Sequence, residues 1–437
     1  MKHLLFSILF AGFSFNAPGQ DTLRLTLEEA LARGVQHNIE LRNQQVNIDL
    51  AEKELGKIGA RRAPVVTASG DLRTNLVLPT TVIPGAAFAS PGQNEEDREI
   101  RFGTIFNLSG TVSATYPVID PLLSADREVA RVKQRLEETV FEKQKANIRL
   151  VIAEAWYDVL LQQEQTRLAA QKRSRALDLL SITIARREGG VALPSDLERS
   201  RLDEANARAA WEQAQNQLLL SRQTLAYRCG LSLDTPIAVS GITLEGVPDM
   251  PSGAQPDQRW ELREEQLRLD LNRLEIDRLN QQYKPNLSLY GSASVQHLSN
   301  DFAIWQRWFP LVFAGLQTNV TLFDGQLKRR NQEIAQLQGL QHQHNLEKWR
   351  EDIQYEIATA RTTLQNARVQ WDSYRQNLDI AARLLELERE RYAGGKAPYS
   401  DYLNAEYSLR EAENNLLRGW YAFLTAQLKW EQAAGVY

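Results

Sequence analysis

The chain has 437 residues, of which 43% are hydrophobic and 24% are charged, and its formal net charge is −4. This is enough material for two or three ordinary domains, and the near-balanced charge offers no basic surface to nucleic acid, which we exclude as a partner. The single cysteine, Cys229, excludes an intramolecular disulfide and the paired cysteines of a redox or zinc motif.

The N-terminus has the pattern of a secretory signal peptide. Lys2 and His3 precede an apolar run from Leu4 to Phe15, and a short segment of small and polar residues follows. We therefore expect residues 1–20 to form a signal peptide, with cleavage between Ala17 and Asp21. The apolar run is too short to cross a bilayer as a helix, and no other long apolar stretch follows, so membrane entry by transmembrane helices is not expected.

The chain contains two copies of one unit. An offset of 205 places Gly394 on Gly189 and Asp401 on Asp196, and this register persists for roughly a hundred residues, which indicates an internal duplication. Upstream the offset becomes 221, where Pro64 matches Pro285, so the first copy carries an insertion. We place the first repeat at 21–230, a Pro- and Gly-rich linker at 231–255 and the second repeat at 256–437.

Each copy has the same order of predicted elements: a helix, a β-hairpin, a very long helix, a double glycine and a returning helix. The β-hairpins are predicted at about 64–117 and 285–323, and the long helices at 122–188 and 326–393. In the first copy the flanking helices are predicted at 27–60 and 195–228. Apolar residues at alternate spacings of four and three along 353–385 and 402–430 form heptad seams, which predict antiparallel helical hairpins.

Four segments alternate between apolar and polar residues, within 66–73, 100–116, 287–295 and 312–322. This period of two fits a half-buried sheet in water, and it also fits a membrane barrel with a wet interior. Four strands cannot close a barrel, and open edges cannot lie in lipid, so the membrane interpretation requires several chains. Three chains would supply twelve strands.

Taken together, the duplication and three motifs resemble the TolC-type outer-membrane efflux proteins. The motifs are LTLEEALARGVQHNIELR (25–42), EGGVALPSDL (188–197) and YAGGKAPYSDYLNAE (392–406). The resemblance implies an α+β membrane protein, a homotrimer with a twelve-stranded β-barrel and a long α-helical coiled-coil barrel extending from the outer membrane into the periplasm. It further implies a passive exit duct for efflux or type I secretion, in contact with outer-membrane lipid. The implied partners are a periplasmic adaptor (membrane fusion) protein and an inner-membrane pump of the resistance-nodulation-division or ATP-driven class.

The resemblance also assigns roles to the residues around each double glycine, which would form the periplasmic tips. The pore or gate positions are Asp196, Tyr392, Asp401 and Asn404. The adaptor contacts are Gly189, Gly190, Val191, Gly394, Gly395 and Lys396. In a trimer Asp401 would form a ring of three carboxylates, which attracts cations. Ala397 stands where the family pattern leads us to expect a gate arginine, so the closed state would rely on other links.

Residue chemistry at the tips predicts how each helix ends. Glycine accepts the left-handed backbone of a helix C-cap, so the double glycines should terminate the long helices. Ser195 is predicted to cap the returning helix, with Glu198 completing a capping box, and Asp401 could cap its own helix. Pro194 and Pro398 are expected to stop the incoming helices.

An enzyme is not indicated, and no cofactor, metal ligand or catalytic residue is predicted. No nucleophile elbow, phosphate loop, HExxH motif or clustered acid pair occurs, and His342 and His344 are two residues apart, which fits a solvated helix surface better than a metal site. A periplasmic coiled-coil adaptor, or another secreted helical-hairpin structural protein, remains the alternative. The sequence leaves the cargo open between drugs, metal ions, metabolites and polypeptides.

Overall fold

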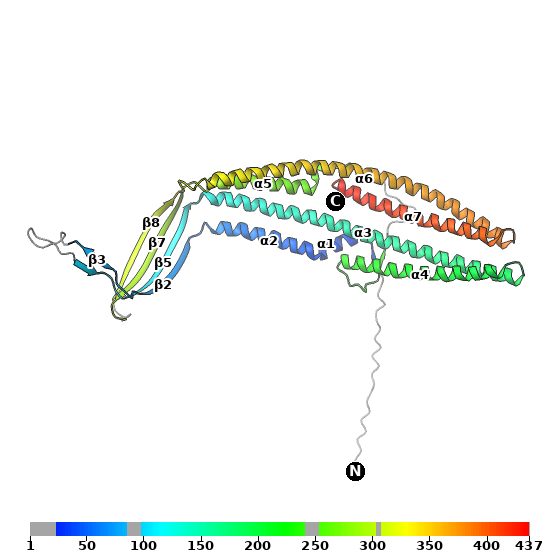
Figure 1. Ribbon diagram of the computed structural model, residues 1–437, viewed down its shortest axis with the longest axis horizontal. Helices are drawn as coiled ribbons and strands as arrows, with labels where there is room; N and C mark the ends of the chain where they lie inside the picture. The colour runs from blue at the N-terminus through cyan, green and yellow to red at the C-terminus, as the bar shows by residue number, and fades with distance from the viewer. Residues whose placement is uncertain (1–22, 85–97, 241–252, 303–306, 437) are drawn as a thin grey trace, which may run out of the picture. The chain divides into compact units, whose positions relative to one another are not determined.

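The computed structural model describes residues 23–84, 98–240, 253–302 and 307–436 (Figure 1). It forms two compact units, and each draws on both halves of the chain. The helical unit comprises Met1–Gln45, Val140–Arg263 and Glu347–Tyr437, and the sheet unit comprises Val46–Thr139 and Glu264–Leu346. The predicted signal peptide, residues 1–20, lies outside the described residues.

The sheet unit is built on four antiparallel strands in the order β2-β5-β7-β8. Their bounds are β2 (Val65–Thr74), β5 (Phe106–Ile119), β7 (Asn286–Ser299) and β8 (Trp308–Asn319). The register aligns Ala68, Val112, Ala293 and Val312 across the sheet. Because directly opposed residues share a face, the apolar positions of all four predicted segments gather on one side of the sheet.

One predicted strand is divided in the structure. The segment 100–116 was expected to be continuous, but its first residues belong to β4 (Arg98–Arg101), which pairs with β3 (Thr80–Ile83) as a separate hairpin. Gly103, with φ +118°, lies between β4 and the start of β5 at Phe106. A residue with positive φ interrupts an extended strand. The alternation of apolar and polar residues continues across Gly103, so the sequence pattern did not reveal that the strand is broken there.

The two long helices match their predicted limits, as α3 (Pro121–Glu188) and α6 (Leu327–Ala393). The predicted helix 27–60 is wrong as one element, because it is divided into α1 (Leu27–His37) and α2 (Ile39–Ala60). Asn38 between them has φ −68° and ψ 124°, and its side-chain oxygen accepts from the Leu41 N–H at 3.0 Å. An Asx cap of this kind ends one helix and starts the next.

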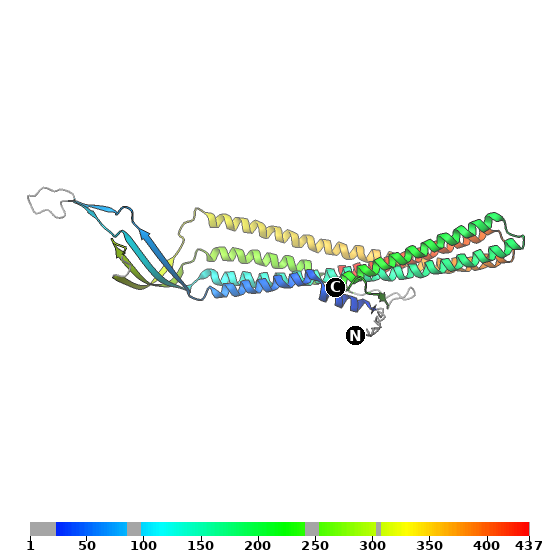
Figure 2. The same cartoon turned by 90° about the horizontal axis from the view of Figure 1, so that it is seen from below.

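The two heptad seams pack inward in the helical unit. The seam at 402–430 is buried, and the seam at 353–385 contains buried and half-buried residues. The returning helices are α4 (Pro194–Arg228) and α7 (Tyr399–Ala433). In both views α4 runs beside the last part of α3, and α7 runs beside the last part of α6 (Figure 2). All nine predicted seam residues of α7 are buried: Tyr402, Ala405, Leu409, Ala412, Leu416, Gly419, Phe423, Ala426 and Trp430.

The predicted linker 231–255 contributes to the fold of the helical unit. Within it, β6 (Ile237–Val239) pairs in parallel with β1 (Leu23–Leu25). Trp156 on α3 donates its indole N–H to the Leu25 carbonyl at 3.1 Å, so this small sheet is joined to the core. A short 3₁₀ helix (Pro256–Gln258) then leads into α5 (Trp260–Gln281). Among the described residues, no helix is both long enough and apolar enough to cross a membrane.

Candidate gate at the helix tips

The two helix tips end in the same hydrogen-bonded motif. Gly190 and Gly395 have φ of +72° and +74°. At the first tip the Val191 N–H donates to the Arg186 carbonyl at 2.9 Å, and the Gly190 N–H donates to the Arg187 carbonyl at 3.0 Å. The second tip repeats both bonds 205 residues later, with distances of 2.8 Å and 3.0 Å. This is a Schellman cap, and it requires the left-handed conformation that glycine adopts without strain.

The six residues predicted to contact an adaptor are all exposed at these tips: Gly189, Gly190, Val191, Gly394, Gly395 and Lys396. The residue after each of these turns is buried instead, Ala192 at the first tip and Ala397 at the second. Each tip therefore presents a short exposed turn on a packed base. Ala397, where a gate arginine was expected, is part of that base.

The returning helices begin differently from the prediction. Leu193 is the N-cap of α4, Pro194 occupies the first helical position, and the Asp196 carboxylate accepts from the Leu193 N–H at 3.4 Å. The predicted Ser195 cap is wrong, because proline suits the first helical position, where its missing N–H is not needed. In α7 the N-cap is Pro398, and Asp401 lies in the first turn without capping the backbone.

Tyr392 joins the second hairpin to α3 of the first. Its ring is buried between those of Tyr399 and Tyr402, with centroids 5.7 Å and 6.1 Å away. The Arg186 guanidinium lies over the ring, 4.2 Å from its centroid, and donates to the Tyr392 carbonyl. The Tyr392 hydroxyl is 3.3 Å from Thr183 Oγ1, which is fully buried. A stacked and hydrogen-bonded cation of this kind holds the two tips together.

Tyr399 provides a second contact, from α7 to α4. Its hydroxyl donates to Asp203 Oδ2 at 3.1 Å. Burial raises the pKa of the Tyr399 hydroxyl, and the neighbouring Asp203 carboxylate raises it further. Burial likewise raises the pKa of Tyr402 to about 12. Both phenols therefore remain protonated at physiological pH, and Tyr399 remains a hydrogen-bond donor.

Further from the tip, Arg175 of α3 binds two carboxylates of α7. It donates to Glu406 at 3.3 Å and, through two nitrogens, to Glu413 at 3.2 Å. Glu406 and Glu413 are seven residues apart, so they lie on one stripe of α7. Both carboxylates are largely covered, with side-chain exposures of 15% and 10%. This forked contact is the most buried ion pair between the hairpins among the described residues.

The pKa values of Arg175 and Glu406 in this contact are shifted by different dominant causes. Burial alone would lower the pKa of Arg175, but the two carboxylates outweigh it and the net shift is upward. For Glu406 burial dominates and raises the pKa, with Glu413 adding to the shift and Arg175 opposing it. Glu406 Oε2 has no hydrogen-bond partner among the described residues. Arginine stays charged, so Glu406 is the member whose protonation can change.

A cavity of about 130 Å³ lies beside this contact, lined by charged and aromatic residues that include Lys172, Asp203, Tyr402, Glu406 and Arg410. Burial lowers the pKa of Lys172, and Arg410 lowers it further. Among the described residues, no group of three or more His, Cys, Asp or Glu side chains could hold a metal ion.

Of the four predicted gate residues, the structure brings only Tyr392 into contact between hairpins. Asp196 caps its own helix, Asp401 is half-buried and receives a hydrogen bond from Ser400 at 3.4 Å, and Asn404 is exposed. Their roles as a gate therefore remain predictions. Sequence reasoning missed Arg186, Arg175 and the paired glutamates, although two acidic residues a heptad apart beside an apolar seam are a detectable signal.

Comparison with known proteins places the chain among outer-membrane channels. The model of the "Outer membrane efflux protein" family matches residues 257–436. The alkaline protease secretion protein AprF of Pseudomonas aeruginosa is 25% identical over 363 residues, covering 79% of this chain and 72% of AprF. The structure of CusC aligns with a TM-score of 0.75 at 17% identity, covering 93% of this chain and 91% of CusC. The outer membrane protein VceC of Vibrio cholerae aligns with a TM-score of 0.70 at 16% identity, covering 94% and 96%.

These alignments confirm the predicted α+β fold of duplicated TolC-like halves. They extend over nearly the whole chain, the sheet and both helical hairpins included, which a periplasmic adaptor with a single hairpin would not match.

Proposed function

We propose that this chain is a TolC-type outer-membrane efflux protein, three copies of which form the exit duct of an efflux or secretion system. The family and fold are those of non-enzymatic outer-membrane channels that extend into the periplasm. The duct is passive, and the energy comes from its partners, a periplasmic adaptor and an inner-membrane pump of the resistance-nodulation-division or ATP-driven class.

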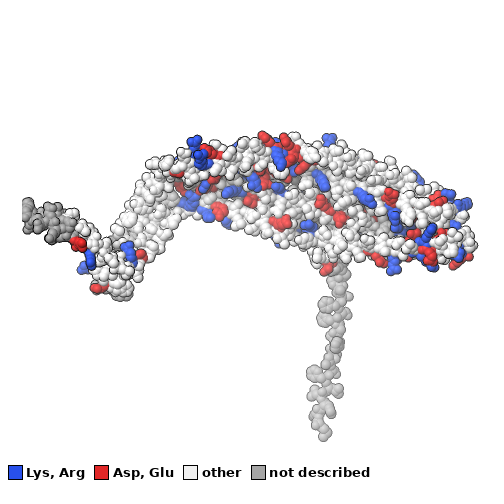
Figure 3. Space-filling view, in the orientation of Figure 1, with Lys and Arg blue, Asp and Glu red and all other residues white. Residues whose placement is uncertain are grey.

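The observation that carries this proposal is the exposed apolar face of a sheet with two free edges. Val66, Val112, Val295, Val312 and Leu316 share that face and are all exposed. Within the described ranges, the end strands β2 and β8 each pair on one side only. Lipid contact explains the apolar face. Lipid cannot form hydrogen bonds with the unpaired backbone N–H and C=O groups of the edge strands, so each edge must pair with another copy of the chain. Figure 3 shows the middle of the strand region as almost free of Lys, Arg, Asp and Glu.

Exposed apolar residues on the helices support the same assembly. In α4 they are Leu202, Leu219 and Leu220, and in α6 they include Leu337, Val369 and Leu387. Large apolar side chains repeated along one helix, when exposed in a single chain, mark a surface that another chain covers. We assign these surfaces to neighbouring copies in a homotrimer with a twelve-stranded barrel.

Gating is assigned to the tips. The exposed turns at Gly189–Val191 and Gly394–Lys396 dock the adaptor, and the contacts from α6 and α7 to α3 and α4 hold the closed state. In the trimer, Asp401 supplies a ring of carboxylates that selects cations. AprF is named for protease secretion, whereas the family is named for efflux, so polypeptides and small molecules both remain cargo candidates.

Two measurements test the assembly and the gate separately. The mass of the detergent-solubilised protein should equal three chains, and a folded monomer without detergent would exclude the duct. In planar bilayers, Asp401→Ala should raise the single-channel conductance and reduce the preference for cations, because a ring of confined negative charge is lost. Asp234→Ala removes an exposed carboxylate in the turn after α4 and serves as the control. If Asp401→Ala leaves both properties unchanged, the gate assignment is wrong even though the duct stands.

A further inference from the structure

The four points where strands meet helices share an excess of basic residues. These junctions are the segments 61–64, 120–127, 278–285 and 324–330, and they contain eight Lys and Arg residues against three Asp. The register places all four at one end of the sheet, because Val65 of β2 opposes Thr115 of β5 and Asn286 of β7 opposes Asn319 of β8. The strands carry few charges, so charged side chains begin where the sheet ends. Of the basic residues in these segments, Arg329 and Arg330 both pair with Glu333, which lies just outside them.

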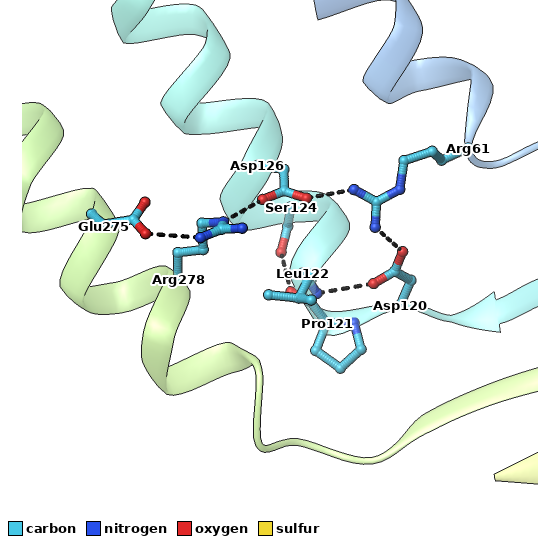
Figure 4. Close-up of polar contacts among 8 residues, drawn as sticks. All are labelled: Arg61, Asp120, Pro121, Leu122, Ser124, Asp126, Glu275 and Arg278. Carbon is cyan, nitrogen blue, oxygen red and sulfur yellow. Dashed lines mark hydrogen bonds and ion pairs between the residues drawn. The ribbon is translucent and has the colours of Figure 1, made fainter. Parts of the chain in front are cut away.

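Some of these cations are committed to structure. Asp126 of α3 lies between Arg61, at 2.5 Å, and Arg278 of α5, at 2.8 Å (Figure 4). Arg61 also binds Asp120 at 2.7 Å, and Arg278 also binds Glu275 at 2.8 Å. Burial opposes the charged form of Asp126, but the two guanidinium groups outweigh it and lower the pKa of that carboxyl. This network fixes the ends of three helices and leaves Arg61 and Arg278 no free charge.

Arg62 and Lys284 are different. Both are exposed, and each lies just before the proline that leads into a strand, Pro64 or Pro285. Among the described residues, neither side chain forms an ion pair or a hydrogen bond. Next to Lys284, Tyr283 donates to Asp324 and lies 4.6 Å beneath the Lys328 ammonium, which brings the last two junctions together. No contact within the described part of the sheet unit uses the charges of Arg62 and Lys284.

Strongly exposed apolar side chains accompany these cations. Leu322 and Phe323, between β8 and α6, are 91% and 82% exposed. Ile119, at the end of β5, pairs with Leu287 on the apolar face of the sheet and is exposed as well. A solvated surface would explain the free cations alone, but it would not explain bulky apolar residues beside them. Apolar side chains next to unpaired Lys and Arg are the pattern of a membrane interface.

We propose that the junctions bind anionic phospholipids, with Arg62 and Lys284 each attracting a headgroup phosphate at its own junction and Leu322 and Phe323 contacting the acyl chains. The inference rests on the proposed function, which places the sheet in a membrane. The bound lipid belongs to the periplasmic leaflet, because the helices begin at this end of the sheet. Free phosphate would satisfy the cations but would leave the apolar residues in water, so the lipid is the better occupant.

Native mass spectrometry of the detergent-solubilised protein, with phosphatidylglycerol or phosphatidylethanolamine added, tests this site. The wild type should retain phosphatidylglycerol more strongly than phosphatidylethanolamine. The variant Arg62→Gln/Lys284→Gln should weaken phosphatidylglycerol binding roughly twenty-five-fold, since each basic residue near an anionic surface is worth about fivefold. Arg42→Gln/Lys53→Gln removes two exposed charges from α2, outside the junctions, and should keep wild-type binding.

Each other result has a definite meaning. Equal retention of both lipids, or unchanged binding in the junction variant, would overturn the proposal. A changed ion selectivity in planar bilayers with unchanged lipid binding would show that these cations line the duct, and would overturn it as well. The protein's mass in the same spectra reports assembly, so failure of the trimer is seen independently of lipid loss.

Discussion

The two returning helices come from one duplicated unit, yet they are buried in different ways. Both α4 and α7 have 35 residues, and both follow the same Schellman cap. At equivalent positions α7 has Leu409 where α4 has Glu204, and Trp420 where α4 has Gln215. The structure buries sixteen residues of α7 but six of α4. The second hairpin therefore forms most of its core within this chain, while α4 leaves Leu202, Leu219 and Leu220 for another surface.

The charges of the two helices are also reversed. Glu406 and Glu413 of α7 correspond to Arg201 and Arg208 of α4. The glutamates bind Arg175 across the hairpins, whereas the arginines pair with Glu198 and Glu212 on their own helix. The duplication thus preserved the turns and changed the residues that join one hairpin to the other. Because the glutamates of α7 bind Arg175 of α3, the second hairpin is stabilised by the first.

The largest effect is expected from Arg175→Ala, which leaves two buried carboxylates on α7 without a cation. Removing one partner of a buried ion pair costs about 3 kcal/mol, and the midpoint of thermal unfolding measured by circular dichroism should fall accordingly. Arg201→Ala breaks an exposed pair on α4 and should cost less than about 1 kcal/mol. Equal losses of unfolding free energy in the two variants would mean that the ion pairs of α4 and α7 contribute equally to stability, which would contradict this comparison.

The tips, where the repeats agree, should respond alike. Gly190→Ala and Gly395→Ala each place a side chain at a φ above +70°, which costs about 1–2 kcal/mol of unfolding free energy. Gly189→Ala is the matched control, because its backbone is not left-handed and the nearest atom to an added Cβ is 3.6 Å away. If Gly189→Ala lost as much unfolding free energy as Gly190→Ala, the cause would be contacts of the added methyl group rather than the left-handed backbone conformation.

A smaller effect is expected from Gly419→Ala, which converts α7 to the residue that α4 has at the equivalent position, Ala214. An added Cβ would lie 2.7 Å from the Tyr374 ring of α6, and such overpacking costs about 1–3 kcal/mol. Better helix propensity returns about 1 kcal/mol, so a net loss of about 1 kcal/mol is expected in chemical unfolding.

Gly56→Ala, in α2, is the control, because an added Cβ there meets nothing within 4 Å, and this variant should gain stability. If Gly419→Ala also gained stability, α6 and α7 would have moved apart to accommodate the added methyl group at little cost.

The smallest effect concerns pH. Because the pKa of Glu406 is raised in the folded protein, its contribution to stability is present below the unfolded value and is lost as pH rises through the folded value. Glu406→Gln abolishes this titration, so the wild type should lose stability relative to the variant as pH rises. Unfolding both proteins at several pH values measures this difference, with the exposed Glu198→Gln as control. A difference that does not change with pH would contradict the raised pKa.

Much of the fold followed from patterns that repeat. The double glycines and the adjoining β segments placed the ends of α3 and α6 to within a residue, and the period of two located the sheet strands. The errors occurred at single residues, where local chemistry competes with the pattern. Asn38 ended a helix through its own side chain, Gly103 interrupted an apparent strand, and Pro194 displaced the expected Ser195 cap.

The candidate site was less predictable, because its contacts join residues about two hundred positions apart. Arg186 and Tyr392 come from different repeats, and neither residue's type nor its spacing indicates that one lies over the other. The same holds for Arg175 with Glu406.

By itself, the sequence determined the duplication, the helix periods, the glycine caps and the alternation of the strands, since each depends on the spacing of residues along the chain. Only the tertiary structure decided which side chains join the hairpins and which cations stay unpaired at the strand ends. Those outcomes depend on packing between distant segments, where a partner's distance and burial determine whether a charge is paired, neutral or free.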